Sequence, residues 1–308
     1  MGFLDSANTL LLDIAIQLED IDTITATYLP KKAFQSMASI SLQLDRLLHQ
    51  IGQTGKRLSD IGSAEGAAGN ISVCIRKPME VSVLFPHMQI VQLPQPAPEL
   101  AGATVIVSGS GCRLRAIAEE PIANLACILV EKDGQTGKMF TSPNQQFERV
   151  TSEFNSHFAV HVDHMLSRDI QLHTVVHGQP IHLTYLSHIA RYQDWRYLNH
   201  HLLRWQPETI INFPDGLGVL PFIMPGSAEQ MTATVKVLRA HNVLVWSQHG
   251  VMARCDDSIL HALDLIEYAE TAAHYEYLNL LADEKSEGLS PQQIRSICEF
   301  WNVRQSVF

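Results

Sequence analysis

The sequence predicts an α/β fold in which helices cover the faces of a central sheet. Two patterns indicate it: short β-like runs crowd residues 71–140, and from residue 152 onward strands alternate with helical segments. The chain has 308 residues, of which 46% are hydrophobic, so it can bury a substantial core. We expect one large domain, or one domain with a sizeable insertion.

The first 60 residues are predicted to be helical. Apolar residues recur at helical spacing over about 6–21 and 31–51. Residues 62–70 are then small and rich in glycine, and residues 71–75 alternate like a strand. We therefore expect N-terminal helices over 1–60 and a core over 61–308 within a single domain.

Further elements follow in order. Short strands are predicted at 81–85, 89–93, 104–107, 126–130 and 138–140. Later strands are expected to end at His177, to lie near Val219 and to cover 243–246 ahead of His249. Helices are expected at about 153–166, between 181 and 205, at 228–240, from Asp257 or Ser258 through Leu280, and at 291–300.

Charge and cysteine usage exclude several classes of protein. The 22 basic and 32 acidic residues give a formal charge of -10 without a Lys/Arg-rich block, which argues against a nucleic-acid or anionic-membrane partner. No apolar run is long enough to predict a membrane span. The five cysteines are odd in number and lack C-x-x-C spacing, so we expect a reducing cytoplasm rather than a disulfide framework.

Two histidines stand where apolar runs end. His177 closes the run 175–177, and His249 follows 243–246. Open α/β sheets present ligands from such strand ends. With the carboxylates of Glu153 and Glu208, these imidazoles supply the groups of a Lewis-acid site with proton-transfer partners. In a chain with 15 histidines, however, a single one is more often a hydrogen-bonded structural group.

Three segments have the composition of anion-binding turns. Asn70 follows a glycine, Ser110 and Gly111 form a small turn, and Thr151 with Ser152 precedes a helix. Exposed backbone N–H groups and hydroxyls at such places favour phosphate. Each segment alone is explained as well by an ordinary turn or helix cap.

Both acidic candidates also have plainer explanations. Glu153 falls in the first helical turn, where the helix dipole alone favours a carboxylate, and His157 and His161 follow it along the same face. Glu208 follows Pro207 and precedes an apolar run, 209–211, that would leave it near the start of a strand. From position alone it is an ordinary surface acid.

In chain order, the motifs resemble the class II aldolase/adducin family. They are Gly69-Asn70-Ile71-Ser72, Ser110-Gly111, Thr151-Ser152-Glu153, His177-x-Gln179-Pro180, Phe213-Pro214-Asp215-Gly216-x-Gly218, Pro225-Gly226 and His249-Gly250-Val251. The likeness covers nearly the whole chain. Within the family, it is strongest to the enzymes that cleave L-rhamnulose 1-phosphate reversibly into dihydroxyacetone phosphate and L-lactaldehyde.

The resemblance implies a three-layer α/β/α fold with a mostly antiparallel central sheet, a bound zinc ion, and a homotetramer with active sites between subunits. It also implies roles for the candidate residues. His177 and His249 would bind the metal, Glu153 would transfer protons, and Glu208 of a neighbouring subunit would lie near the aldehyde. The phosphate would be surrounded by Asn70, Ser110, Gly111, Thr151 and Ser152.

Two positions depart from the family pattern. The family's metal motif is H-x-H, and its second histidine is here Gln179, whose amide oxygen is a weaker zinc ligand than imidazole. Such a site binds metal less tightly, recruits another donor such as His182, or has lost the metal. Ala67 stands where the most similar aldolases place an asparagine, which removes one expected phosphate donor.

These observations favour a cytoplasmic, zinc-dependent aldolase acting on a small sugar phosphate. Two alternatives stay open: an aldolase or epimerase for another sugar phosphate on the same scaffold, and a non-catalytic interaction domain of the adducin type. Retention of Glu153 and Glu208 argues against the interaction domain, whereas Gln179 argues for it.

Overall fold

The computed structural model describes residues 31–308. The chain divides into the units Met1–Leu47 and Leu48–Phe308, and the second holds the sheet and the helices that cover it. The helix expected over 6–21 lies outside the described residues. The helix expected over 31–51 is longer than predicted: α2 spans Lys31–Asp60, and Leu58 near its end is fully buried in the second unit. The predicted boundary between residues 60 and 61 stays a prediction.

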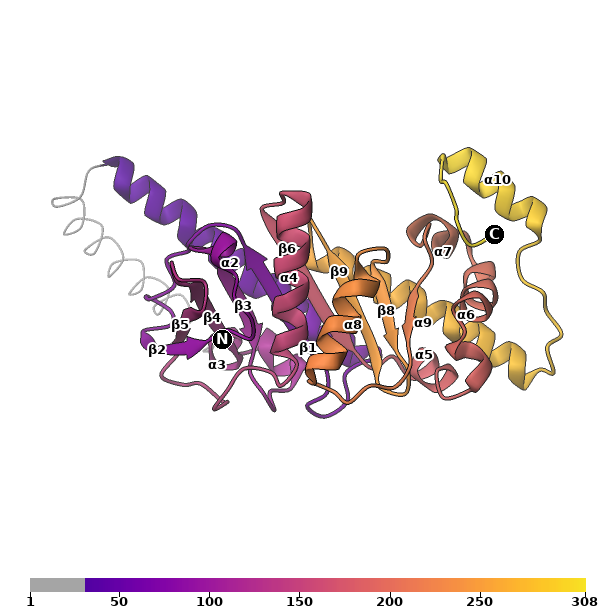
Figure 1. Cartoon of the computed structure of the whole chain (residues 1–308), viewed down its shortest axis with the longest axis horizontal. Coiled ribbons are helices and arrows are strands. Elements are labelled where there is room, and N and C mark those ends of the chain that lie inside the picture. The colour runs from indigo at the N-terminus through magenta and orange to yellow at the C-terminus, as the bar shows by residue number, and fades with distance from the viewer. Residues whose placement is uncertain (1–30) are drawn as a thin grey trace, which may run out of the picture. The chain divides into compact units, whose positions relative to one another are not determined.

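One nine-stranded sheet forms the centre of the second unit (Figure 1). Its order is β2-β5-β4-β3-β1-β6-β9-β8-β7, and every neighbouring pair is antiparallel except β7 and β8. The strands are β1 (Asn70–Ile75), β2 (His87–Gln92), β3 (Thr104–Ser108), β4 (Leu125–Val130), β5 (Thr136–Thr141), β6 (Leu172–Gly178), β7 (Gly218–Leu220), β8 (Val243–Trp246) and β9 (Gly250–Cys255). The mostly antiparallel sheet is thereby confirmed.

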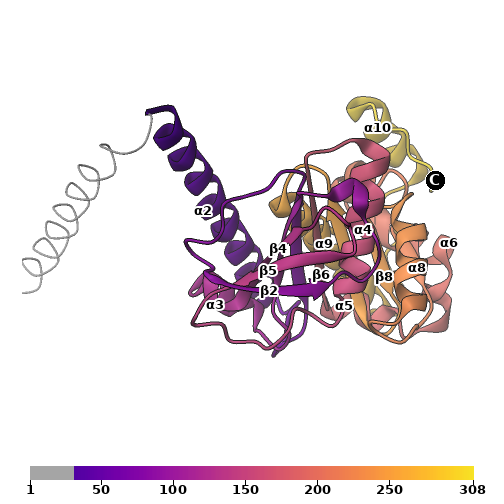
Figure 2. The same ribbon diagram turned by 60° about the vertical axis from the view of Figure 1, so that its left-hand side comes forward.

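Helices cover both faces of this sheet. The α-helices are α3 (Pro121–Asn124), α4 (Phe154–Arg168), α5 (Ile181–Leu186), α6 (Trp195–Leu202), α7 (Pro207–Asn212), α8 (Ala228–Leu238), α9 (Ile259–Leu281) and α10 (Pro291–Trp301); short 3-10 turns are η1 (Pro98–Leu100), η2 (Leu114–Ala118), η3 (Ala190–Gln193) and η4 (Leu203–Trp205). α4 and α8 lie side by side on one face, and α9 passes behind the other (Figures 1 and 2). This is the predicted three-layer arrangement. No helix among residues 31–308 is long and apolar enough to cross a bilayer.

The α4 face explains why the core forms where it does. Phe158 and Met165 of α4 pack with alternate residues of β1, β3 and β4, and Val160 packs with β6, β8 and α8. Alternation sends every second strand residue to this face. This layer therefore holds two apolar clusters, one against β1, β3 and β4 and one against β6, β8 and α8.

Two predicted strands are wrong. Residues 81–85 form a turn, in which the backbone N–H groups of Leu84 and Phe85 both donate to the carbonyl of Val81. Residues 209–211 lie in α7, because Pro207 occupies the first helical turn and the Thr209 hydroxyl bonds the carbonyl of Gln206. β9 was not predicted separately, because only the turn at 247–249 divides it from β8.

Candidate active site

A cavity of about 220 Å³ opens where β6 ends and β1 begins. Every site residue predicted from the sequence lines it except Glu208. The lining comprises Ala67, Ala68, Gly69, Asn70, Gly109, Ser110, Gly111, Thr151, Ser152, Glu153, His177, Gln179, Pro225 and His249. Segments from six separate parts of the chain therefore meet in one hollow.

His177 is held by the strand beside it. It is the penultimate residue of β6, and its Nδ1 lies 2.7 Å from the carbonyl oxygen of Val251 on β9. Because a carbonyl can only accept, Nδ1 carries the proton and the lone pair of the neutral ring lies on Nε2. Nε2 faces the Glu153 carboxylate, 3.5 Å from Oε2. A backbone acceptor that fixes the second ring nitrogen is typical of metal-binding histidines.

His249 lies in the tight turn between β8 and β9. The preceding residue, Gln248, has a φ of 65°, and its N–H donates to the Ser187 hydroxyl at 2.7 Å. Gly250 follows at a point where an added Cβ would meet the carbonyl oxygen of Gly178 at 2.5 Å. The turn thus needs glycine to bring His249 against the end of β6. Burial lowers the pKa of His249 to about 4, and the neutral ring is the form that binds metals.

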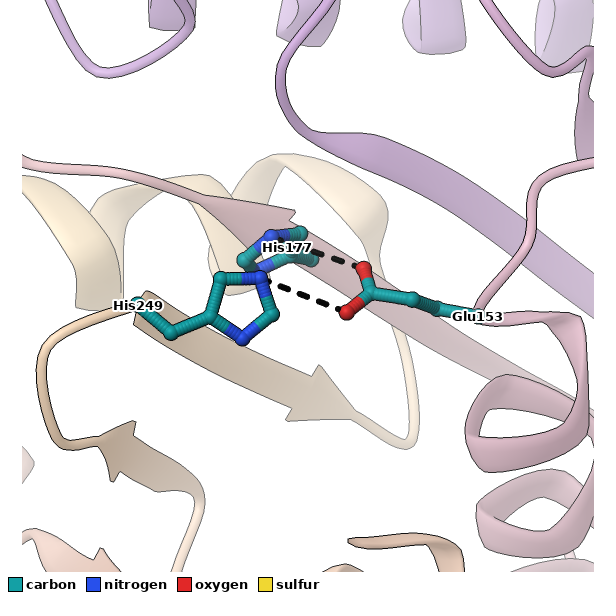
Figure 3. Close-up of side chains that lie close together, drawn as sticks. All are labelled: Glu153, His177 and His249. Carbon is teal, nitrogen blue, oxygen red and sulfur yellow. Dashed lines mark ion pairs between the residues drawn. The ribbon is translucent and has the colours of Figure 1, made fainter. Parts of the chain in front are cut away.

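The Glu153 carboxylate faces both imidazoles, whose rings lie next to each other (Figure 3). It is the N-cap residue of α4 and is only 4% exposed. Oε2 accepts a hydrogen bond of 2.8 Å from the Asn70 amide, whereas the buried Oε1 has no hydrogen-bond partner and lies 3.4 Å from Nε2 of His249. Burial raises the pKa of Glu153, but His177 and the Asn70 amide outweigh it, so the pKa lies below its usual range.

These three side chains fit a divalent cation. Their ligand atoms all lie within 4.8 Å of one another. Zinc bonds of about 2.1 Å that meet at a tetrahedral angle hold two ligand atoms about 3.4 Å apart. The two carboxylate–imidazole separations, 3.5 Å and 3.4 Å, match that spacing. A cation here would also satisfy the orphaned Oε1 of Glu153.

The phosphate candidates line the same cavity. Asn70 is the register partner of His177, so the pairing of β1 with β6 places them side by side. Thr151 and Ser152 precede the N-cap residue of α4, Glu153, whose backbone N–H donates to the Thr151 hydroxyl at 3.4 Å. Gly111 adopts a φ of 79° and is exposed, as an open turn beside the hollow requires. The cavity thus joins hydroxyls and an amide to Glu153, His177 and His249.

Of the three remaining residues that the sequence singled out, one lines the cavity and two do not. Gln179 lines the cavity beside His177. His182 is outside the lining: its Nδ1 lies 2.7 Å from Glu270 Oε1, and its ring stacks on His274. Glu208 is exposed on α7 and does not line the cavity of its own chain.

Gln230 is a site neighbour that the sequence did not single out. Its Oε1 accepts from the N–H of Gly226 at 2.8 Å, so its amide N–H groups face Nδ1 of His249 at 3.5 Å. Gln230 is 1% exposed within α8. A single glutamine in an amphipathic helix gives no sequence signal that it will contact a histidine of the cavity.

Comparison with known proteins agrees with this architecture. Residues 49–277 match the family model described as Class II Aldolase and Adducin N-terminal domain. A rhamnulose-1-phosphate aldolase of Yersinia pseudotuberculosis serotype IB is 28% identical over 221 residues, which is 71% of this chain and 79% of that protein. The rhamnulose-1-phosphate aldolase of Yersinia pestis strain Pestoides F is 28% identical over 215 residues, covering 69% and 77%.

Solved structures share the fold at lower identity. The sugar-phosphate aldolase of Thermotoga maritima aligns with a TM-score of 0.65 and 22% identity, over 80% of this chain and all of that one. An L-fuculose 1-phosphate aldolase aligns with a TM-score of 0.51 and 16% identity, covering 83% and 95%. The family match spans most of the chain, and the geometry, motif order and relatives agree with it. This protein belongs to the class II aldolase and adducin family.

Proposed function

We propose that this chain is a zinc-dependent aldolase that reversibly cleaves L-rhamnulose 1-phosphate into dihydroxyacetone phosphate and L-lactaldehyde. The observation that carries the proposal is the cavity in which two imidazoles face the two oxygens of one buried carboxylate. The named substrate is supported by the rhamnulose-1-phosphate aldolases at 28% identity.

His177 and His249 are the proposed metal ligands, with Glu153 beside them. Bound there, a divalent cation would supply Lewis-acid stabilisation of the negative charge that develops on the three-carbon fragment. Glu153 takes the proton from the C4 hydroxyl as the C3–C4 bond breaks, and a proton is then returned to C3 of the three-carbon fragment, which gives dihydroxyacetone phosphate. Its pKa below the usual range keeps it ionised near neutral pH and therefore ready to accept that proton.

Asn70, Ser110, Gly111, Thr151 and Ser152 are proposed to surround the phosphate. Hydroxyls and amide groups can donate to phosphate oxygens from several directions. Phosphate at this end of the cavity would fix the three-carbon end of the sugar near His177 and Glu153. This anchoring would hold the reacting carbons beside the acid/base without a flexible cationic side chain.

Glu208 is proposed to act on the aldehyde end of a neighbouring subunit's site. It is exposed on α7, away from the cavity of its own chain, which suits a residue that serves another copy. The proposal includes a homotetramer.

All five cysteines are unpaired, which supports the proposed reducing cytoplasm.

Product analysis tests the function. Incubation of zinc-loaded protein with L-rhamnulose 1-phosphate is expected to release dihydroxyacetone phosphate and L-lactaldehyde in equal amounts, and chelation of the metal should stop it. Recovery of an epimerised sugar phosphate, or cleavage of L-fuculose 1-phosphate alone, would replace the proposed substrate. No reaction with any ketose 1-phosphate in metal-loaded protein would favour the interaction domain.

Complementation tests the shared site. Glu153→Gln and Glu208→Gln variants are each expected to be nearly inactive, whereas hybrid oligomers made by mixing them should regain activity, because some sites then hold both carboxylates. Verified hybrids that stay inactive would show that Glu208 does not complete a neighbour's site.

A further inference from the structure

A buried chain of polar side chains leads away from the Glu153 carboxylate. Asn70 donates to Glu153 Oε2, and its carbonyl oxygen Oδ1 contacts Nε2 of His157. Nδ1 of His157 lies 2.7 Å from the Ser72 hydroxyl. That hydroxyl lies 2.7 Å from Nε2 of His161, whose Nδ1 lies 2.7 Å from Nδ1 of His173 (a residue of β6).

Every member of this chain is shielded from solvent. Ser72, His157, His161 and His173 are each 0% exposed, and Asn70 is 6% exposed. Groups buried so completely must satisfy one another, because water is not available to them. Their donor and acceptor roles are therefore coupled along the whole chain.

The carboxylate sets the direction of the hydrogen bonds. An ionised carboxylate only accepts, so Asn70 presents its NH2 group to Glu153 and its carbonyl to His157. His157 must then carry its proton on Nε2 and accept from Ser72 at Nδ1, since burial lowers its pKa to about 3 and keeps it neutral. Ser72, having donated its one hydrogen, accepts from His161.

The same reasoning continues to the last histidine. Burial lowers the pKa of His161 to about 3, so its ring is also neutral and its Nδ1 accepts from Nδ1 of His173. All five hydrogen bonds thus point from His173 toward Glu153. Such alignment holds the Asn70 amide in one of its two flipped orientations and leaves Oε1 of Glu153 as the free oxygen.

We propose that His157 is a positioning residue for the acid/base Glu153. Acting through Asn70, with its tautomer fixed by Ser72 and His161, it holds one carboxylate oxygen, Oε2, so that the other, Oε1, faces the imidazole of His249 in the cavity. This inference rests on the proposed function of Glu153. Without the Nε2–H of His157, Asn70 is free to turn its carbonyl toward the carboxylate, and Glu153 loses its donor.

The main test compares two substitutions at one position. His157→Leu removes donor and acceptor, whereas His157→Gln keeps a donor and an acceptor on the side chain. We expect His157→Leu to lower kcat roughly 10- to 100-fold with KM changed less than about twofold, and His157→Gln to recover most of the loss. The matched control is His164→Leu, another buried histidine of α4 whose ring nitrogens have no hydrogen-bond partner among the described residues; its kcat should stay near that of the native protein.

A double-mutant cycle distinguishes positioning from general loss of packing. If His157 acts only through Asn70, the kcat of Asn70→Ala/His157→Leu equals that of Asn70→Ala alone. Independent, multiplying losses would overturn the proposal. Should His157→Leu fail to fold, Ser72→Ala provides the second variant: it frees the His157 tautomer, and we expect a loss of kcat of roughly 3- to 10-fold. An unchanged kcat in a folded Ser72→Ala protein would also overturn it.

Crystal structures supply a readout that needs no substrate. We expect the contact between Asn70 and Glu153 to be lost in His157→Leu and restored in His157→Gln. A carboxylate that keeps its position in His157→Leu refutes the proposal even if the enzyme acts on a different sugar. Failure of the proposed reaction, with the carboxylate displaced as expected, refutes only the assigned function.

Discussion

The two ends of β6 carry the same kinds of side chain in opposite electrostatic settings. At one end, His177 and His249 face Glu153, whose Oε1 has no partner. Toward the other, about 13 Å away along the strand, His173 and His164 form a similar trio with Asp256. Both trios would be picked by residue type alone as metal sites.

Guanidinium groups separate the two cases. Asp256 bonds Arg168 through Oδ2 at 2.8 Å and Arg254 through Oδ1 at 3.2 Å. Both of its oxygens are therefore already paired with positive charge, and a divalent cation would have to approach two arginines. Glu153 has no guanidinium partner, and its carboxylate faces two neighbouring imidazoles. The two trios have the same types of side chain, so the positive groups that already pair with the carboxylate decide which trio suits a metal.

The largest expected effect is loss of the metal from one trio only. His249→Ala should remove nearly all bound zinc and with it the activity, whereas His173→Ala should retain about one ion per chain. Elemental analysis of chelator-treated and zinc-reconstituted proteins measures both. Zinc lost from His173→Ala and kept in His249→Ala would reverse the assignment of the two sites.

Removal of the proposed acid/base, Glu153, is expected to be nearly as severe. Glu153→Gln keeps the size of the side chain and one acceptor oxygen but cannot take a proton, so turnover should fall by roughly 10²-fold or more. Steady-state rates with the folded variant measure this. Near-native turnover would exclude Glu153 from proton transfer. The matched Asp163→Asn variant, on α4 outside the cavity lining, should leave turnover unchanged.

Acid should destabilise the fold through the histidine-rich interior. Burial lowers the pKa of His157 and His161 to about 3 and that of His164 to about 4, against 6.5 for an ordinary histidine. The unfolded chain therefore binds protons first as pH falls, and stability is lost from about pH 6.5 toward pH 4, by up to about 1.4 kcal/mol per pH unit for each histidine.

Urea unfolding of metal-free protein between pH 7.5 and 5 measures that slope. His164→Leu removes one buried titrating group without removing a hydrogen bond of the described residues, so its stability should depend less steeply on pH. An equal or steeper slope in His164→Leu would contradict the neutral, buried state assigned to that ring.

The smallest effect is expected at the phosphate end. Ser110→Ala should raise KM roughly 3- to 10-fold through loss of one hydrogen bond to a charged group, with kcat within about twofold. Ser306→Ala is the matched control, because Ser306 lines a separate hollow with Arg168 and Arg254. Equal KM values for the two variants would remove Ser110 from the substrate contacts.

The sequence predicted the strand ends better than the side-chain network. Residues 175–177 and 243–246 are apolar runs, and both are strands that lead to the cavity. The strand prediction failed at 209–211, because this short apolar run fits a helix as well as a strand. Pro207, in the first turn of α7, favours the helix. Local pattern also could not reveal that Arg168 and Arg254 converge on Asp256, since that contact depends on tertiary packing.

The sequence predicted which residues form the site but not how they are arranged in space. Motif order identified the residues of the hollow, yet spacing along the chain does not show that Asn70 pairs in register with His177. Nor does it show which oxygen of Glu153 is free. Those facts follow from strand pairing and burial.

Anomalous diffraction at the zinc edge, on crystals of the zinc-reconstituted protein, tests the central claim most directly. The account predicts one strong peak among Glu153, His177 and His249, and none at His164, His173 and Asp256. A peak at the arginine-flanked trio, or none between the two cavity imidazoles, would contradict it.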